Sequence, residues 1–427
     1  MKTSLRPLCS LFLVVMSLLY AHLVSGQWQA MTDTGGIYVS KCSFPSSDVG
    51  YVIGVYSFTG WYAMLKTTDG GQTWTEIFTQ GPLGEQLFDL DFISENEGFM
   101  GLRINVGPTM VSRVWRTTDG GQNWENASPM NGDPGTGSSA ISALVGGHVY
   151  HGSSVNLNSS HDSGDTWTET VNDEFDSALS MAAISGQKAA AGMWDGTFGY
   201  RGSLYLTQDG GQNWTKTNIE KWYSQITAVL TPDAQTVMGL SKGAGWNDGF
   251  PSLYKSNDFG ASWDTLHINI MANRSASDMA LLNDTLYVSS SDHQDIVRSS
   301  DGGLTFTADY TAEQPVACMC ASPQGALYAF GNNGMVIKKH STAPGVGETE
   351  AGGTSVFPNP AGSQLQWKSL HPIQRLQILD ASGKLVLQTK PDTNSGVIDV
   401  SFLPAGIYLM TIVDASGQES RQKLVIQ

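Results

Sequence analysis

The sequence predicts an all-β protein, a seven-bladed β-propeller followed by a small β-sandwich, and three observations support this. Glycine contributes 48 of the 427 residues and charged residues only 15 %, a balance typical of turn-rich β proteins with uncharged polar surfaces. A motif of the form Ser/Thr-x-Asp-x-Gly-x-x-Trp recurs six times at a nearly constant spacing. After the repeats, a short glycine-rich stretch leads into a segment with a different pattern of short alternating strands.

The N-terminus reads as a secretory signal peptide. Lys2 and Arg6 precede an apolar stretch, and small residues before Gln27 suit a signal peptidase, so we expect residues 1–26 to be removed. A membrane anchor is the alternative. Polar residues interrupt the apolar stretch, however, and leave it shorter than the ~20 residues of a bilayer span.

The charge of the chain excludes one class of partner. Its formal net charge is −16, and removal of the leader makes it more negative. Such an acidic chain repels phosphate backbones, so we expect no nucleic-acid partner. No segment after the leader is apolar enough to span a bilayer, so we also expect no transmembrane segment.

Six aspartates mark the repeat, and they lie 43 to 50 residues apart. In such a motif the aspartate accepts hydrogen bonds from turn amides, glycine supplies positive φ, and the aromatic ring packs the turn against the sheet. A period in this range matches one four-stranded propeller blade. The aspartates and the aromatic residues five positions later are Asp69 and Trp74, Asp119 and Trp124, Asp162 and Trp167, Asp209 and Trp214, Asp258 and Trp263, and Asp301 and Phe306.

The motifs KTTDGGQTW, RTTDGGQNW and YLTQDGGQNW resemble Asp-box repeats, also called BNR repeats, of sialidase-like and photosystem-assembly-factor-like propellers. The resemblance implies that each box joins the third and fourth strands of a blade, on the face opposite the binding site. It therefore implies a structural role for the six aspartates rather than a catalytic one.

Residues 27–340 have room for seven units of this length, although they contain only six boxes. Residues 315–340 read as three strands and then stop. The segment QWQAM at the expected mature N-terminus resembles the strand that follows a box, with Trp28 at the aromatic position. We therefore expect this strand to complete the seventh blade against residues 335–340, which closes the ring and removes exposed sheet edges.

A linker and a second domain are expected after the propeller. Residues 341–353 are small, polar and glycine-rich, which predicts a flexible linker, and residues 354–427 predict a small immunoglobulin-like β-sandwich. FPNPA at 357–361, LPAGIYLM at 403–410 and a basic last strand resemble the type A C-terminal sorting domain of type IX secretion. The resemblance implies export through the periplasm to the surface or the exterior of a Gram-negative bacterium, with the type IX machinery as partner. An ordinary immunoglobulin-like binding domain is the alternative.

The sequence predicts no metal site and no cofactor. It contains no His-Glu-x-x-His motif, and His148 and His151 lie three apart in a predicted strand, so their side chains point to opposite faces. After removal of the leader the cysteines are Cys42, Cys318 and Cys320. They allow buried free thiols or one disulfide, with metal binding by the last two as a weaker alternative.

Two classes of function fit this organisation: binding of a glycan, peptide or surface partner without catalysis, and glycoside hydrolysis. A sialidase-like site needs an arginine cluster, an Arg-Ile-Pro motif and a Tyr–Glu pair, and the nearest segment has Arg103 and Ile104 followed by Asn105. Xyloglucanase-like sites lie between two propellers, and this chain has room for one. Because no nucleophile or acid can be assigned, binding without catalysis is the preferred interpretation, and a sialidase-like or xyloglucanase-like hydrolase is the alternative.

The binding face is expected opposite the boxes, on the loops that join second and third strands. We expect these loops at residues 57–62, 103–113, 193–202 and 242–251, and they are rich in aromatic residues. Rings beside charged side chains suit sugar faces or peptide side chains, although the same rings can instead pack the loops onto the propeller. The expected ligand-binding residues are Trp61, Tyr62, Arg103, Trp194, Asp195, Tyr200, Arg201, Trp246 and Asp248, with Trp194 and Trp246 at the centre.

Overall fold

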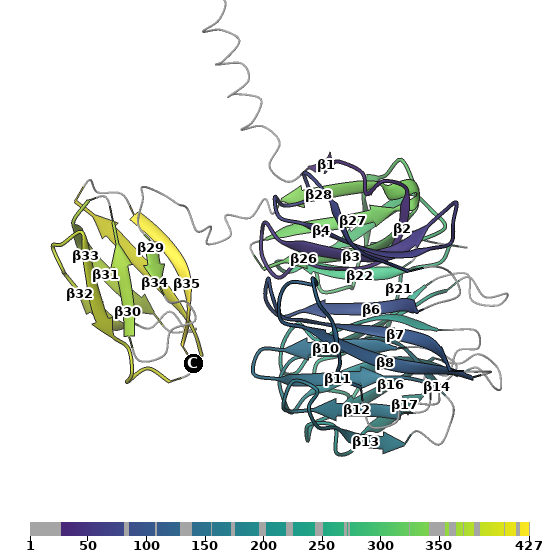
Figure 1. Ribbon diagram of the computed structural model, residues 1–427. Helices are drawn as coiled ribbons and strands as arrows, with labels where there is room; N and C mark the ends of the chain where they lie inside the picture. The colour runs from purple at the N-terminus through teal and green to yellow at the C-terminus, as the bar shows by residue number, and fades with distance from the viewer. Residues whose placement is uncertain are drawn as a thin grey trace, which may run out of the picture. The chain divides into compact units, whose positions relative to one another are not determined.

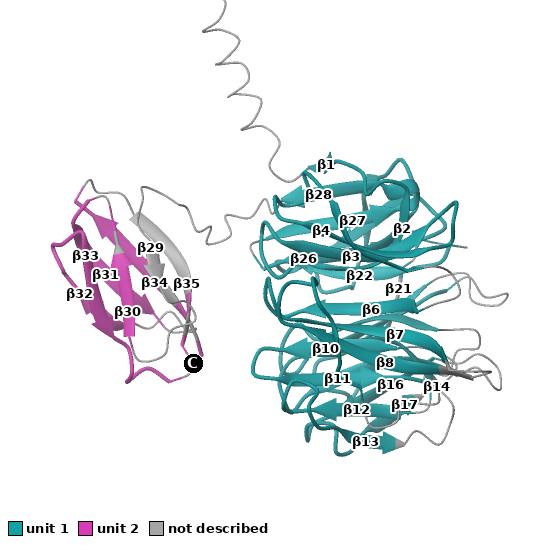
Figure 2. Ribbon diagram, viewed as in Figure 1, with its two compact units in different colours: residues 1–341 teal, residues 342–427 magenta. Residues whose placement is uncertain are grey.

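The structure is a computed structural model, and contacts divide the chain into two compact units, Met1–Ser341 and Thr342–Gln427. Figure 2 colours the two units separately. The described part of the chain is built from β-strands and contains no α-helix, and none of its helical turns is long and apolar enough to cross a membrane. The described residues are 27–80, 85–106, 109–128, 139–154, 156–171, 176–195, 202–218, 225–243, 251–268, 271, 274–323, 325–340, 355–357, 364–369, 371–379, 385–404, 406–415 and 419–426.

The first unit contains seven four-stranded antiparallel sheets, the number that the repeat spacing predicts (Figure 1). In six of them the strands follow one another along the chain, and each strand pairs with the next. We call these sheets blades 1 to 6. They contain β2 (Ile37–Ser43), β3 (Gly50–Tyr56), β4 (Tyr62–Thr67) and β5 (Thr75–Gln80); β6 (Gln86–Phe92), β7 (Gly98–Val106), β8 (Thr109–Thr117) and β9 (Glu125–Asn126); β10 (Ala140–Leu144), β11 (His148–Gly152), β12 (Asn156–Ser160) and β13 (Thr168–Val171); β14 (Asp176–Ala183), β15 (Ala189–Asp195), β16 (Gly202–Thr207) and β17 (Thr215–Asn218); β18 (Ile226–Leu230), β19 (Val237–Ser241), β20 (Ser252–Ser256) and β21 (Asp264–His267); β22 (Asp278–Leu282), β23 (Thr285–Ser289), β24 (Asp295–Ser299) and β25 (Thr307–Thr311).

Blade 7 combines the two ends of the unit. It contains β26 (Val316–Ser322), β27 (Ala326–Gly331) and β28 (Val336–His340), and the N-terminal β1 (Trp28–Ala30) is its fourth strand. A short 3-10 turn, η2 (Asn332–Gly334), joins β27 to β28. β1 pairs antiparallel with β28, with Trp28 opposite Lys339. The strand pairing that closes the ring is therefore the one that QWQAM predicts.

Polar side chains hold the closing strand in place. Trp28 is buried and donates its indole Nε1–H to Asp309 Oδ2 at 2.7 Å. Lys339 binds the same carboxylate oxygen at 2.6 Å, and both partners of this ion pair are buried. The Lys339 ammonium also lies over the rings of Trp28 and Tyr287. Since Asp309 belongs to blade 6, this cluster ties the N-terminus to two blades at once.

The first strands of neighbouring blades contact one another in a closed cycle, from β2 through β6, β10, β14, β18, β22 and β26 back to β2. They therefore surround the propeller axis. Side-chain oxygens on these strands accept backbone amides of the next first strand: Ser43 accepts Phe92, and Ser180 accepts Val229, at 3.0 and 2.9 Å. Apolar clusters fill the space between adjacent sheets, as in the cluster that joins blades 1 and 2 around Tyr51.

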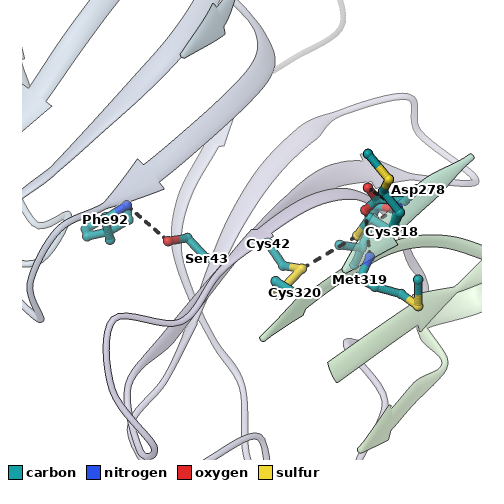
Figure 3. The surroundings of a disulfide bond; sticks show 9 residues. Cys42, Ser43, Phe92, Asp278, Cys318, Met319 and Cys320 are labelled. Carbon is teal, nitrogen blue, oxygen red and sulfur yellow. Dashed lines mark hydrogen bonds between the residues drawn. A yellow bond between two sulfur atoms is a disulfide. The ribbon is translucent and has the colours of Figure 1, made fainter. Parts of the chain in front are cut away.

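A disulfide between Cys42 on β2 and Cys320 on β26 links the first strands of blades 1 and 7, as Figure 3 shows. The sequence left open free thiols, one disulfide or a metal site, and the described part of the structure contains one disulfide. Cys318 is a buried free thiol, and its Sγ lies 3.9 Å from Cys42 Sγ. The ring is thus closed twice, by strand pairing at β1 and β28 and by a covalent bond between β2 and β26.

The second unit contains two antiparallel sheets, one of three strands and one of four. Buried apolar residues of both sheets, among them Leu365, Trp367, Ile378 and Met410, form one shared core. Two sheets around one core make a β-sandwich. The sheets contain β29 (Ser355–Phe357), β30 (Gln364–Lys368) and β33 (Ser395–Asp399), and β32 (Leu385–Thr389), β31 (Ile373–Leu379), β34 (Gly406–Asp414) and β35 (Glu419–Ile426).

Candidate binding face

Each Asp box is a hydrogen-bonded turn, and the box of blade 1 shows the pattern. Thr67, at the end of β4, donates its hydroxyl to Asp69 Oδ1 at 2.8 Å and accepts the amide of Gly71 at 2.8 Å. Asp69 also accepts the amide and the hydroxyl of Thr73, at 2.8 and 2.6 Å. Gly71 has a φ of +89°, which side chains disfavour. The carboxylate is therefore fully occupied by its own turn.

The same pattern recurs in the other five boxes, with the side-chain amides of Asn123 and Asn213 replacing the hydroxyl in two of them, and it lowers the aspartate pKa in each. Hydrogen bonds from the residue four positions later are the largest cause, and they lower the pKa of Asp69, Asp119, Asp258 and Asp301 to about 2. These carboxylates are ionised, and as hydrogen-bond acceptors they stabilise the turn that contains them. The hydroxyl residues equivalent to Thr67 are Thr117, Ser160, Thr207, Ser256 and Ser299.

Strand direction separates the boxes from the turns between second and third strands. In each of blades 1 to 6 the box joins the third strand to the fourth. Because neighbouring strands are antiparallel, the turn between the second and third strands lies at the opposite end of the sheet. We call the end with the boxes the box face and the other end the loop face.

Three of the expected ligand-binding residues lie on the loop face in blades 1 and 2. Trp61 is 46 % exposed in the turn between β3 and β4. Tyr62 begins β4, and its hydroxyl interacts electrostatically with Arg103 on β7. Arg103 is half-buried, which lowers the pKa of its guanidinium, and its Nη2 donates to Gln86 Oε1 at 2.6 Å. The structure thus brings Tyr62 and Arg103 together and leaves Trp61 facing solvent.

The expectation of a loop at residues 103–113 was wrong. The described residues of this segment belong to one long hairpin of β7 and β8, in which Arg103 pairs with Ser112 and Val106 pairs with Thr109. Ile104, Val106, Thr109 and Val111 are β-branched and favour strand backbone, and this preference extends the hairpin through the segment. Arg103 is therefore a strand residue.

Trp194 lies in β15 of blade 4, where it pairs with Ser177 and Gly202 on the two neighbouring strands. It is partly buried. Asp195 ends β15, and its side chain lies outside the described residues. The remaining expected residues, Tyr200, Arg201, Trp246 and Asp248, also lie outside them, so the central pair of Trp194 and Trp246 stays a prediction.

The loop face carries a cavity of about 200 Å³ that the sequence did not predict. Register shifts in β2, β18 and β26 leave Ser40, Thr227 and Ala317 outside the regular pairing. Such bulges redirect side chains, and these three line the cavity near the propeller axis. Because a bulge arises from strand pairing, no local sequence pattern marked these positions. The lining residues are Tyr38, Ser40, Thr227, Lys242, Ala276, Ser277, Ser291 and Ala317.

The cavity is lined by hydroxyl groups and one ammonium group. Tyr38, Ser40 and Thr227 contribute hydroxyls, and Lys242 is exposed at the end of β19. No carboxylate is among the lining residues that the structure describes. On a chain with a net charge of −16 this is a locally non-acidic surface, suited to polar ligands with hydrogen-bonding or anionic groups.

The first strands carry charged groups further from the loop face. Asp89 lies 4.0 Å from the Lys41 ammonium and accepts the amide of Ile141 on the next blade. Burial raises the pKa of Asp91 to about 7 and that of Asp278 to about 6. Backbone amides of the next blade also bind these two carboxylates, so they act as links between blades. No group of three or more His, Cys, Asp or Glu in the described residues could hold a metal ion.

Comparison with known families follows the same division of the chain. Residues 21–340 match the family described as Photosynthesis system II assembly factor YCF48. The chain belongs to the YCF48 family. Residues 355–427 match the secretion system C-terminal sorting domain, so this YCF48-like propeller carries a sorting domain at its C-terminus. No curated protein sequence matches the chain.

Solved structures support the propeller fold at low sequence identity. A structure of YCF48 bound to D1 peptide is 19 % identical with a TM-score of 0.54, and the match covers 75 % of this chain and 97 % of that one. YCF48 from Cyanidioschyzon merolae is 17 % identical with a TM-score of 0.54, covering 73 % and 98 %. A streptogramin B lyase is 8 % identical with a TM-score of 0.53, covering 73 % and 96 %. At these identities the likeness shows the fold alone.

Proposed function

We propose that this chain is an exported propeller that binds a peptide segment of a protein partner on its loop face, without catalysis. The observation that carries the proposal is the cavity on that face, lined by hydroxyls and Lys242. Two apolar side chains are exposed on the same face of blade 1, Phe58 fully and Trp61 by nearly half. A polar cavity and exposed aromatic rings on one face are features that binding sites commonly combine.

The chemistry of the cavity favours binding over hydrolysis. A glycoside hydrolase needs two carboxyl groups about 5–9.5 Å apart on either side of the scissile bond. The described lining of the cavity offers none, and the first-strand aspartates Asp89, Asp91 and Asp278 are bound by backbone amides. Hydroxyls and an ammonium can instead hold backbone carbonyls or carboxylates of a ligand.

Two further points favour a peptide over a glycan. An extended peptide offers carbonyls to the hydroxyl groups and apolar side chains to Phe58 and Trp61. A propeller of the same family has been solved bound to a peptide. The glycan-binding alternative, with the same face and the same aromatic residues, is an outcome of the test below.

Export is the second part of the proposal. A signal peptide at residues 1–26 would take the chain to the periplasm, and the domain at 354–427, joined to the propeller 27–340 by the linker 341–353, would direct it through the type IX machinery. The ligand would then be met at the cell surface or outside the cell. Deletion of residues 354–427 should leave the propeller in the periplasm, and a truncated chain that still reached the medium would contradict the role of the domain.

The binding proposal is tested with the full mature chain. Peptides selected from a random display library are titrated against the wild type and against Trp61→Ser and Lys242→Ala. We expect the dissociation constant to rise about tenfold or more in each variant, the loss of one useful contact. Leu304→Ser is the control, because Leu304 is also an exposed apolar residue but lies on the box face.

Three outcomes of this experiment would count against the proposal. The loop face would be the wrong site if Leu304→Ser weakened binding and the two loop-face variants did not. If parallel panels gave glycan ligands but no peptide ligands, the ligand of the loop face would be a glycan and the peptide proposal would be wrong. Release of sugar from polysaccharides or sialosides, lost on a single Asp or Glu substitution, would establish the hydrolase alternative.

A further inference from the structure

Blade 3 carries two histidines whose ring nitrogens face each other on the box face. His148 begins β11, and His161 is the middle residue of the box triplet Ser160-His161-Asp162. Their Nδ1 atoms are 2.8 Å apart, and the two rings are nearly perpendicular. His161 is exposed and His148 is half-buried, so solvent reaches the pair. In the other boxes the same position holds Thr68, Thr118, Gln208, Asn257 or Ser300.

A backbone carbonyl fixes the protonation of one ring. The Nε2 atom of His161 lies 3.1 Å from the carbonyl oxygen of Gly210 in the box of blade 4. A carbonyl can only accept, so Nε2 carries the proton and Nδ1 of the neutral ring is left with a lone pair. Metal-ligating histidines are oriented by this kind of bond, from the second ring nitrogen to a carbonyl or carboxylate.

Two glycines of blade 4 make room for the rings. A Cβ atom at Gly186 would lie 2.3 Å from the His148 ring, and one at Gly210 would lie 2.9 Å from the His161 ring. Both rings therefore pack directly on backbone, between two blades whose positions the propeller fixes. The pair is held by rigid turns on both sides.

We propose that His148 and His161 form a surface site for a divalent transition metal ion that favours imidazole ligands and tetragonal geometry, Cu²⁺ above all. Two nitrogens in adjacent positions of such a site, each about 2.0 Å from the ion, lie about 2.8 Å apart. The hydrogen bond that joins the two Nδ1 atoms already holds them 2.8 Å apart, so an ion that replaces the shared proton needs little change in their spacing. Small rotations of the rings turn both lone pairs toward a shared ion, and the proton between the two Nδ1 atoms moves to Nε2 of His148.

Water supplies the remaining ligands of the ion. The nearest carboxylate along the chain, Asp162, is occupied by bonds from Ser160 and Thr166 within its own box. Two protein ligands leave positions open, so the bound ion can accept a further ligand from another molecule. The site lies on the box face and is independent of the peptide site proposed on the loop face.

The test measures Cu²⁺ binding by the full mature chain, by calorimetry and by electron paramagnetic resonance. We expect splitting from two nitrogen ligands in the wild type, and an affinity at least about tenfold lower in His148→Ala and in His161→Ala. His371→Ala removes an exposed histidine of the second unit and should leave the affinity unchanged. Zn²⁺ should bind more weakly than Cu²⁺.

A third variant separates metal binding from loss of the fold. Gly186→Ala keeps both histidines but places a methyl group against the His148 ring, so we expect it also to weaken Cu²⁺ binding. Thermal unfolding of each variant confirms that the propeller is intact. Equal affinity in the wild type and the folded His161→Ala variant would overturn the proposal, and tighter binding of Zn²⁺ than of Cu²⁺ would overturn the tetragonal geometry.

Discussion

The box aspartates and the first-strand aspartates Asp89, Asp91 and Asp278 all accept backbone amides, but they do so in opposite surroundings. The box carboxylates lie at the surface, where hydrogen bonds within one turn lower their pKa. The first-strand carboxylates are enclosed by neighbouring blades, where burial raises their pKa. A box holds two strands of one blade, whereas a first-strand aspartate joins two blades.

This difference explains why the box residues are visible as a sequence repeat and the residues that link neighbouring blades are not. Box residues lie at the same place in each of blades 1 to 6, because each of these blades makes the same turn between its third and fourth strands. The first-strand linkers vary along the ring: Ser43, Asp89, Ser142, Ser180 and Asp278 each accept an amide of the next blade. Any short side chain with an acceptor can make that bond, so no constant residue marks it in the sequence.

The largest effect is expected from Asp89→Ala. The change leaves the buried amides of Leu90 and Ile141 without their acceptor, and it removes one of the two carboxylates, with Asp278, that stabilise the Lys41 ammonium. We expect a loss of about 3–5 kcal/mol in the free energy of unfolding, because two buried amides are left unsatisfied at about 1–3 kcal/mol each. Chemical denaturation measures it. Asp89→Asn keeps an acceptor and should lose less; equal losses in the two variants would show that hydrogen bonding to the next blade is unimportant.

The second effect is a change in how stability depends on pH. The pKa of Asp91 is about 7 in the folded chain and 3.8 in the unfolded one, so between these values the folded state binds an extra proton. Stability should therefore fall as the pH rises from about 4 to 7, with a contribution of up to about 1.4 kcal/mol per pH unit. Asp91→Asn should remove this contribution in denaturation curves recorded across this range, and leave below about pH 6 the smaller slope that Asp278 contributes through its folded pKa of about 6.

The box aspartates should act in the opposite direction and at lower pH. Their folded pKa values of about 2 lie below the unfolded value of 3.8, so their contribution is complete above about pH 4 and is lost as the pH falls toward 2. In the Asp91→Asn variant, stability plotted against pH should still fall below about pH 4, which we call the acid limb. If the variant lost the acid limb and kept the slope above pH 4, the assignment of the two environments would be reversed.

Opening the disulfide tests the junction between blades 1 and 7. Cys42→Ser removes the covalent link between residues 278 positions apart, and we expect a loss of about 2–4 kcal/mol because the unfolded chain gains freedom. Urea unfolding of the wild type with and without a reductant should give a difference of the same size. No change in either comparison would mean that the β1 and β28 pairing alone closes the ring.

The smallest effect is expected at a single box. Thr117→Val keeps the shape of a side chain that is 1 % exposed but removes the hydroxyl that accepts the Gly121 amide and donates to Asp119. We expect a loss of about 1–3 kcal/mol in the free energy of unfolding. Thr118→Val, one residue on and exposed, should change it by less than about 0.5 kcal/mol. Similar losses in both variants would argue against the box as a clasp.

Patterns that act within one hairpin could be predicted from the sequence. The six box turns follow from aspartate, glycine and aromatic residues at constant spacing, and the closing strand follows from one unpaired segment at each end of the propeller. The N-terminal leader and the C-terminal motifs predicted an exported chain, and the family match at residues 355–427 confirms the sorting domain. The residues of each box are close in the chain. The closing strand could be predicted because the last repeat lacked a fourth strand that the other repeats have.

Interactions between blades were decided only by the tertiary structure. The cavity at Ser40 and Thr227 depends on bulges in strands nearly two hundred positions apart, and the Cys42–Cys320 bond depends on ring closure. His148 lies in a strand and His161 in a box turn thirteen positions later, and only the folded blade places their Nδ1 atoms 2.8 Å apart. Packing of sheets around a closed ring sets these distances, and no local pattern of residues carries that information.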